Sequence, residues 1–234
     1  MLANWDERKT KMLLGPVTLG PVRSLFEQIQ SQEMLATMGL TGGAAAYGKS
    51  IMANGANILF SKAAFNEIGG YERNGNPSGD DVFTMLKMNE KWPKSIDFVK
   101  DFRAIVQTKP QANFSAFWQQ RKRWLSKKSG YSNRWVKASA VITYAANLSC
   151  FIALITVLLN FGNPFTSQLL WLLFVKTILD LMLIRTVRKD LQPDCAIWNI
   201  LPAEIFIITY ISIIGLIGNV RKYDWKGRSI NVNG

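Results

Sequence analysis

The sequence predicts an α/β domain followed by α-helical transmembrane segments. Three observations support this fold class. Helix-like and strand-like patterns alternate over residues 1–116, no Asp, Glu, Lys or Arg occurs in the 38 residues from 138 to 175, and seven Lys or Arg residues crowd into 121–137. A content of 48% hydrophobic residues excludes a disordered or collagen-like chain. The basic cluster beside the apolar stretch follows the positive-inside rule and places the first 137 residues in the cytoplasm.

The net charge of +12 is unevenly distributed along the chain. Residues 1–120 contribute +2, residues 121–137 contribute +7 and residues 138–234 contribute +3. A nucleic-acid-binding protein would carry its excess of basic residues on the soluble part, which here is close to neutral. The position of the excess beside the apolar stretch indicates membrane lipids as partners and argues against nucleic acid.

The first predicted element is a helix over residues 24–38. Its apolar side chains share roughly one helical face, and we expect it to stop before Gly39 and the glycine pair that follows. Residues 57–60 have the length of a short buried strand. Ser61 is then the N-cap of a second helix, which ends at the next glycine pair.

The following segments continue this mixed pattern up to the basic cluster. Residues 80–92 have apolar positions in helical register, and Pro93 ends that helix. Residues 95–108 are strand-like, and a helix from about residue 113 to 128 leads into the basic cluster. This order of elements is typical of an α/β unit that feeds a membrane anchor.

The apolar part predicts two or three membrane spans. A single helix of 38 residues would be roughly 57 Å long, about twice the ~30 Å hydrocarbon core. We therefore expect spans at 139–161 and 165–184, with a third candidate at 197–218. Three spans from a cytoplasmic start would leave the basic tail at 221–228 on the far side. Either the tail is an exception to the charge rule, or one segment is interfacial or re-entrant.

Lys176 and Asp180, four residues apart, bring charge into the second span. They predict either a buried ion pair that faces other helices or a segment that lies along the membrane surface. Cys150 lies in the first span and Cys195 in a polar connection, so the two are poorly placed for a structural disulfide. The sequence has no His, and two Cys alone do not complete a zinc site.

Asp80 and Asp81 are two adjacent carboxylates at the point where a turn enters the helix of residues 80–92. Backbone N–H groups and the helix dipole hold a carboxylate ionised at this position, which suits a general base. The alternative is purely structural, because Ser78-Gly79-Asp80-Asp81 also matches a capping box.

A second candidate group lies on the helix of residues 113–128. With ~100° per residue, Gln120, Arg123 and Trp124 share one arc of this helix. Arg is a bidentate partner for phosphate, and an indole stacks on the apolar face of a sugar ring. The neighbouring arc is aromatic and suits the membrane interface, and it consists of Phe114, Phe117, Trp118 and Leu125. The alternative is a solvated amphipathic helix on an anionic leaflet.

Taken together, the two groups resemble a known family. Asp80-Asp81, followed about forty residues later by the run from Gln120 to Trp124 and then by membrane spans, resembles the C-terminal half of a membrane-bound family 2 glycosyltransferase. That family includes cellulose, hyaluronan and poly-N-acetylglucosamine synthases, and its motifs are an acidic pair and Q-x-x-R-W. Shorter stretches that fit the same pattern lie at 14–17, 55–57, 65–71 and 225–228.

The resemblance implies a GT-A catalytic domain that transfers a sugar, with inversion, from a nucleotide-sugar to an acceptor hydroxyl on a glycan or lipid. By position, Asp81 would be the general base and Asp80 would support it. Gln120 and Arg123 would bind the diphosphate of the donor. The acceptor would contact Trp124, Gly55 and Asn57.

The sequence departs from that family in its N-terminal part. It has no D-x-D motif, which in that family holds a divalent Mg²⁺ or Mn²⁺ ion, and only thirteen residues precede Leu14. The metal is therefore expected for the intact family enzyme, while its ligands are absent from this chain. We expect a partial GT-A-type domain that lacks its nucleotide-binding N-terminal half and does not bind a nucleotide-sugar productively alone.

These inferences divide the chain into four parts. Residues 1–112 form the C-terminal part of a GT-A-like domain, 113–137 an amphipathic basic helix at the interface, 138–220 two to three transmembrane helices and 221–234 a basic tail. The expected location is the bacterial inner membrane, with the catalytic part cytoplasmic. The alternative function is a non-catalytic membrane anchor or interaction protein, in which the capping box and the amphipathic helix are only structural.

Overall fold

A computed structural model describes residues 1–6, 9–71, 79–131, 133–160, 162, 164–217, 222–225 and 228–231. The strands and helices of the soluble part are β1 (Met12–Leu14), β2 (Val17–Leu19), α1 (Leu25–Ala46), β3 (Ile58–Phe60), α2 (Lys62–Glu67), α3 (Asp80–Lys91), β4 (Ile96–Phe98), β5 (Val106–Thr108) and α4 (Phe114–Ser126). Short 3₁₀ turns cover Leu2–Asn4, Phe102–Ala104 and Lys127–Gly130. Then follow α5 (Arg134–Leu159), α6 (Thr166–Leu191), α7 (Ile200–Ile217) and the strands β6 (Lys222–Trp225) and β7 (Arg228–Asn231).

The strands form small sheets that hold the soluble part together. The first sheet has the order β3-β1-β4, with β1 antiparallel to β3 and parallel to β4. The strand β2 pairs with β5 in parallel, and β6 with β7 in an antiparallel hairpin. Consecutive β1 and β2 thus belong to different sheets. The segment 95–108, predicted as one strand-like stretch, is split into β4 and β5 by a 3₁₀ turn that Asp101 caps.

The core beneath the first sheet is formed by β1, α2 and α3. Met12 and Leu14 of β1 are buried against Met85 and Met88 of α3, and Val136 from the first turn of α5 joins the same cluster. The predicted helix at 80–92 and the Ser61 N-cap are both found, since the Ser61 hydroxyl accepts from the Ala64 N–H at 3.3 Å. The core therefore fixes the N-terminus of α3 relative to the start of α5.

The central helix α1 is longer than the sequence predicted, because its glycines are packing positions and do not end the helix. It begins at a capping box formed by Ser24 and Glu27. It continues through Gly39, where an added Cβ would lie 2.7 Å from Cγ2 of Val187 on α6. At Gly42, an added Cβ would lie 3.0 Å from the ring of Phe98. The missing side chains let α6 and β4 approach the helix closely.

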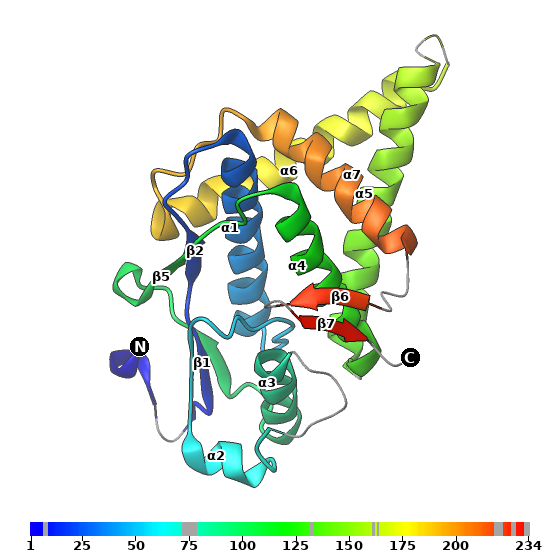
Figure 1. Cartoon of the computed structure of the whole chain (residues 1–234). Helices are drawn as coiled ribbons and strands as arrows, with labels where there is room; N and C mark the ends of the chain where they lie inside the picture. The colour runs from blue at the N-terminus through cyan, green and yellow to red at the C-terminus, as the bar shows by residue number, and fades with distance from the viewer. Residues whose placement is uncertain are drawn as a thin grey trace.

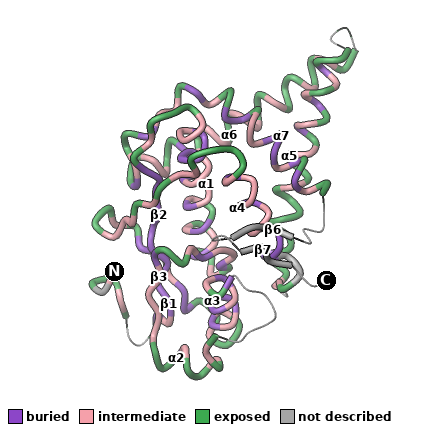
Figure 2. Tube along the Cα trace, viewed as in Figure 1, coloured by how far each residue is buried: buried purple, intermediate pink, exposed green. Residues whose placement is uncertain are grey.

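Three helices, α5, α6 and α7, are long and apolar enough to cross a membrane. They correspond to the three predicted spans. In Figure 1, α5 and α6 form a hairpin that projects from the body of the molecule, while α7 runs back across it. Most residues of this hairpin are exposed or half-buried (Figure 2). Its apolar surface therefore requires a non-aqueous environment.

Lys176 on α6 forms a buried ion pair that faces another helix, the first of the two alternatives. Its ammonium bonds to a carboxylate oxygen of Glu204 on α7 and lies 2.8 Å from Asp180. The side chain of Glu204 is 4% exposed. Cys150 and Cys195 are both buried and free, as their positions in the sequence predicted.

Candidate functional site

The carboxylate of Asp81 sits between three groups at the N-terminus of α3. Its Oδ2 accepts a hydrogen bond from the Gly55 N–H at 2.9 Å, and its Oδ1 accepts one from the Val82 N–H at 2.9 Å. The ammonium of Lys127, just after α4, lies 3.6 Å from Oδ1. The side chain is 22% exposed. The carboxylate of Asp81 is therefore held in place by these three groups and still reaches solvent.

Gly79 shapes the approach of α3 to the end of α4. It is the N-cap of α3 and has a φ of +112°, a left-handed conformation that glycine adopts without strain. An added Cβ would lie 2.9 Å from the Phe83 ring and 3.2 Å from Cδ of Lys127. Gly79 brings no side-chain hydrogen bond to the start of the helix. Ser78, on which the capping-box alternative depends, lies outside the described residues, so that alternative stays a prediction. Asp80 is exposed beside Gly79.

The loop of residues 54–57 carries the Gly55 N–H that contacts Asp81. Asn57 fixes this loop, because its Nδ2 donates to the Pro16 carbonyl at 2.8 Å and to the Ala104 carbonyl at 2.7 Å. Its own carbonyl accepts from the Gly15 N–H at 2.8 Å. The side chain of Asn57 is buried. The structure thus gives Asn57 a tie between backbone segments, while Gly55 is the residue that adjoins the carboxylate.

The buried guanidinium of α4 is that of Arg121, which the sequence analysis did not single out. It pairs with the carboxylate of Glu33 on α1, and the Tyr210 hydroxyl on α7 donates to the same carboxylate. Its Cζ lies 4.2 Å from the ring centres of both Phe117 and Trp124. Arg121 therefore ties α4 to α1 and α7. A signal for this was available, because Arg121 lies four residues after Phe117, on the apolar arc of the helix.

The aromatic arc of α4 is buried at Phe117 and partly exposed elsewhere. Phe117 is fully buried, and its ring contacts Phe26 of α1 and Phe206 and Tyr210 of α7 at centroid distances of 5.1 to 5.5 Å. Phe114 at the first turn remains 54% exposed. Phe117 is therefore a core residue, whereas the anchoring role expected for the rest of the arc stays a prediction.

The three predicted residues of the other arc lie on the last two turns of α4. Gln120 accepts from the Arg121 guanidinium at 2.6 Å, which fixes its amide. Arg123 is half-buried, and Trp124 is 36% exposed, with its ring against Arg121. Lys127 follows Trp124 by one turn and contacts Asp81. The acidic pair and the end of the α4 helix are thus neighbours in space.

Tyr131 packs against α3, close enough to Asp81 to feel its charge. Its ring packs on Phe83 of α3 with 5.7 Å between centroids. Burial, assisted by the negative charge of Asp81, raises the pKa of Tyr131 to about 12. The phenol is therefore neutral at physiological pH and keeps its proton beside the carboxylate.

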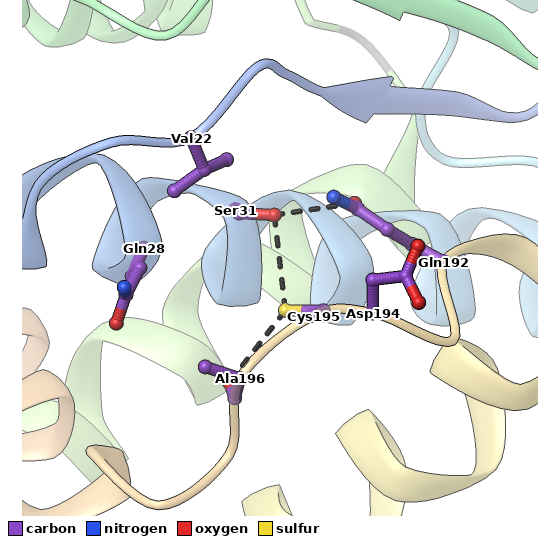
Figure 3. A pocket seen from close by; sticks show the side chains of 7 residues that line it. All are labelled: Val22, Gln28, Ser31, Gln192, Asp194, Cys195 and Ala196. Carbon is purple, nitrogen blue, oxygen red and sulfur yellow. Dashed lines mark hydrogen bonds between the residues drawn. The ribbon is translucent and has the colours of Figure 1, made fainter.

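A separate small cavity of about 100 Å³ lies where the connector between α6 and α7 docks on α1 (Figure 3). Ser31 and Gln192 form a 3.2 Å hydrogen bond in its wall, and Cys195 lies 3.8 Å from Ser31. Burial raises the pKa of the Cys195 thiol, so it is not an activated nucleophile. This cavity does not include the acidic pair.

A divalent metal held by protein side chains alone needs several Asp, Glu, His or Cys ligands close together. No three Asp, Glu, His or Cys side chains gather as ligands anywhere in the part of the chain that the structure describes. We therefore derive no chemical step through a metal ion.

Comparison with known proteins assigns the chain to a family. The family model described as glycosyl transferase family 21 matches residues 10–234. No curated protein matches the sequence. The match corrects the assignment to family 2 and its cellulose, hyaluronan and poly-N-acetylglucosamine synthases, because family 21 is a distinct family. An acidic pair and a Q-x-x-R-W run occur here in a family 21 chain, so these motifs do not distinguish the two families.

Proposed function

As the chain belongs to glycosyl transferase family 21, we propose that it transfers a sugar from a nucleotide-sugar to the hydroxyl of a membrane lipid, with Asp81 as the general base. The family is glucosylceramide synthase-like, which favours a lipid acceptor over a growing polysaccharide. The observation that carries the base assignment is the position of the Asp81 carboxylate, which is exposed to solvent and adjoins the end of the α4 helix.

The proposed reaction is a single displacement with inversion. The acceptor hydroxyl gives its proton to a carboxylate oxygen of Asp81, and the oxygen attacks the anomeric carbon of the sugar. The bond from that carbon to the diphosphate oxygen breaks, and the nucleoside diphosphate leaves with the electron pair. A positioned carboxylate and a cationic group at the leaving oxygen are what this displacement needs.

The proposed roles of the other site residues rest on where each one lies relative to Asp81 and α4. Gln120 and Arg123, on the last turns of α4, supply an amide and a guanidinium for the donor diphosphate. Trp124 offers a half-exposed indole face to a sugar. Asp80 supports Asp81 electrostatically at the helix N-terminus. Gly55 and Asn57 hold the loop against Asp81, and Gly55 leaves room for the acceptor. We propose that this soluble domain has a GT-A-type architecture.

The test replaces Asp81 in the gene of the producing cell, so that the protein is assayed in its native membrane. Asp81→Asn should lower sugar transfer to the lipid fraction by about 10²- to 10⁴-fold, because it removes the base. Membranes receive one radiolabelled nucleotide-sugar at a time, and the label in extracted lipids is counted. The KM for the donor should change little, since the phosphate contacts remain.

Glu90→Gln, an exposed carboxylate at the other end of α3, is the matched control and should leave transfer unchanged. If Asp81→Asn retains wild-type transfer, the base assignment is refuted. If deletion of the gene leaves the transfer of label to lipid unchanged, the chain is the non-catalytic anchor or interaction protein. If Glu90→Gln lowers transfer equally, the effect of Asp81→Asn reports the folding of α3 and the base assignment is refuted.

A further inference from the structure

Both ends of α7 are attached to the same soluble domain. Before α7, the connector of residues 192–199 is held on α1, where Nε2 of Gln32 donates to the Ala196 carbonyl at 2.5 Å and to Oδ1 of Asn199 at 2.7 Å. The Gln192 amide also donates to the Leu19 carbonyl at the end of β2. After α7, β6 packs beside α4 (Figure 1). A helix fixed in this way begins and ends on the same side of a bilayer.

The middle of α7 is also attached to the soluble domain. The Tyr210 hydroxyl donates to Glu33 of α1, and the Phe206 ring lies 5.7 Å from Phe26 of α1 and 5.5 Å from Phe117 of α4. If α7 crossed the hydrocarbon core, the segments of α1 and α4 along it would have to enter the core as well. These segments carry the buried ion pair of Glu33 with Arg121, which would be costly there.

The outer face of α7 is apolar and uncovered by protein. Its exposed side chains are Leu201, Ile205, Ile213, Leu216 and Ile217, with exposed fractions from 41% to 65%. A third face packs on α5, where an added Cβ at Gly215 would overlap the Tyr144 ring. Trp198, 77% exposed, stands directly before α7, and indoles favour the membrane–water interface. α7 packs beside α5 and α6, which also expose many apolar side chains, so we infer that lipid covers the outer face of α7 as well.

The C-terminal turns of α6 belong to the soluble domain as well. Leu183 and Val187 pack against Gly39 of α1, and Asp190 pairs with Lys100. The segment of α6 left for the bilayer is residues 166–182, and its charged residues, Lys176 and Asp180, lie in the half nearer the soluble domain, where Lys176 also pairs with Glu204 of α7. Seventeen residues correspond to about 25 Å, which is at the lower limit for a span.

The charges of the sequence agree with this arrangement. Basic residues occur in 121–137 before α5, at the end of α6 in Arg185, Arg188 and Lys189, and in the tail at 221–228. The connection between α5 and α6, residues 160–165, contains no charged residue. If α7 does not cross, all three basic segments lie on one side and the uncharged connection on the other. The conflict with the positive-inside rule that three spans created then disappears.

We propose that α5 and α6 alone cross the bilayer, as a hairpin, and that α7 lies in the membrane interface on the side of the soluble domain, with its outer face in lipid. This arrangement does not depend on the reaction that the protein catalyses. The membrane-embedded region then consists of a single hairpin and an interfacial helix, and the tail lies beside the domain that β6 contacts.

The first test determines the side of four positions by labelling single cysteines with a membrane-impermeant maleimide. Gly43→Cys, Gly162→Cys, Asp194→Cys and Gly234→Cys are each introduced into a Cys150→Ala/Cys195→Ala chain, and labelling is compared between intact cells, where only the outer side is reached, and permeabilised cells, where both sides are reached. Added side chains at Gly43 and Gly162 meet no atom within 4 Å, so these substitutions leave the packing unchanged.

Cysteines at 43, 194 and 234 should label from one side, and the cysteine at 162 from the opposite side. Labelling of 234 together with 162 would establish a third span and refute the proposal. Labelling of all four from one side would refute the hairpin. Fluorescent-protein and alkaline-phosphatase fusions after residue 234 of the wild-type chain report the side of the tail without removal of the native cysteines.

The second test measures how deep α7 lies. Ile205 and Leu216 are eleven residues apart and differ by about 20° around the helix, which separates them by about 16 Å along its axis. Nitroxide labels at Ile205→Cys and Leu216→Cys should show similar depths, as judged by accessibility to oxygen and to a nickel chelate. A difference approaching about 16 Å would mean that α7 crosses the bilayer.

Discussion

At the scale of single residues, Tyr131 has a pKa that is raised mainly by burial and secondly by the negative charge of Asp81. Its pKa in the folded protein, about 12, lies above the ordinary value of 10. The neutral phenol is therefore favoured by the fold, and this stabilisation is complete below pH 10 and lost as the pH rises towards 12. The loss amounts to at most about 2–3 kcal/mol and is reduced by solvent screening.

The corresponding experiment compares wild type with Tyr131→Phe, which keeps the ring packed on Phe83. Between about pH 9 and about pH 11.5, the wild type should lose more unfolding free energy than the variant, because only the wild type ionises a buried phenol. Thermal unfolding in detergent at the two pH values measures this difference. Parallel curves for the two proteins would show that Tyr131 does not titrate within the folded core.

Arg121 stabilises the fold through its buried charge, which pairs with Glu33. Arg121→Met should destabilise the protein by about 3–5 kcal/mol, because it leaves the Glu33 carboxylate buried without its cation. Adding Glu33→Gln should restore much of this loss, since the neutral amide still accepts from Tyr210. The exposed pair of Arg103 with Asp101 is the control, and Arg103→Met, which keeps Asp101 as the cap of its turn, should leave the stability nearly unchanged.

Denaturant unfolding of the two single variants and the double variant gives the coupling energy directly. Additive effects in the Arg121 and Glu33 series would contradict the ion pair.

The same residues show why the candidate site was only partly predictable from the sequence. The pattern of α4 predicts its two faces, but a helical wheel does not indicate that Glu33, 88 residues earlier, supplies the partner of Arg121 and not of Arg123.

At the scale of elements, α1 contains a matched pair of glycines with opposite expected effects. An added Cβ at Gly39 would lie 2.7 Å from Val187, a β-branched side chain that moves little, whereas one at Gly43 meets nothing within 4 Å. Gly43→Ala should therefore stabilise the helix by about 0.5–1 kcal/mol through its higher helix propensity. Gly39→Ala should destabilise the protein by about 1–3 kcal/mol through overpacking against α6.

Thermal unfolding of both variants in the same detergent is the measurement. Equal stabilisation by the two substitutions would mean that α6 does not approach α1 at Gly39.

The glycines of α1 also show which helix and strand bounds the sequence alone does not predict. Helices α3 and α4 and the strand β3 follow from local signals such as Ser61, Pro93 and apolar periodicity. The glycines of α1 look like breakers in one dimension, because the sequence does not show that α6 lies against them. The division of residues 95–108 between two sheets is hidden for the same reason, since each half pairs with a strand some 80 to 90 residues away.

At the scale of the whole molecule, α1 acts as a spine that holds two distant segments. Gln30 and Gln32, both buried, are two residues apart and face different partners. Gln30 exchanges hydrogen bonds with the backbone of Gln111, before α4. Gln32 binds the connector before α7 through Ala196 and Asn199. One helix thus links the helix that carries the proposed donor contacts to the membrane helices.

Substituting each glutamine separately tests the two attachments of α1, one to the segment before α4 and one to the connector before α7. Gln32→Leu leaves the Ala196 carbonyl and the Asn199 amide without their donor, which costs about 1–3 kcal/mol per buried group, so amide exchange should rise in residues 192–199. Gln30→Leu should raise exchange around Gln111 and leave the connector protected. Hydrogen–deuterium exchange with mass spectrometry of the full chain in detergent resolves the two segments. If either variant raised exchange equally in both segments, α1 would unfold as one unit, and the separate attachments argued for α4 and α7 would be wrong.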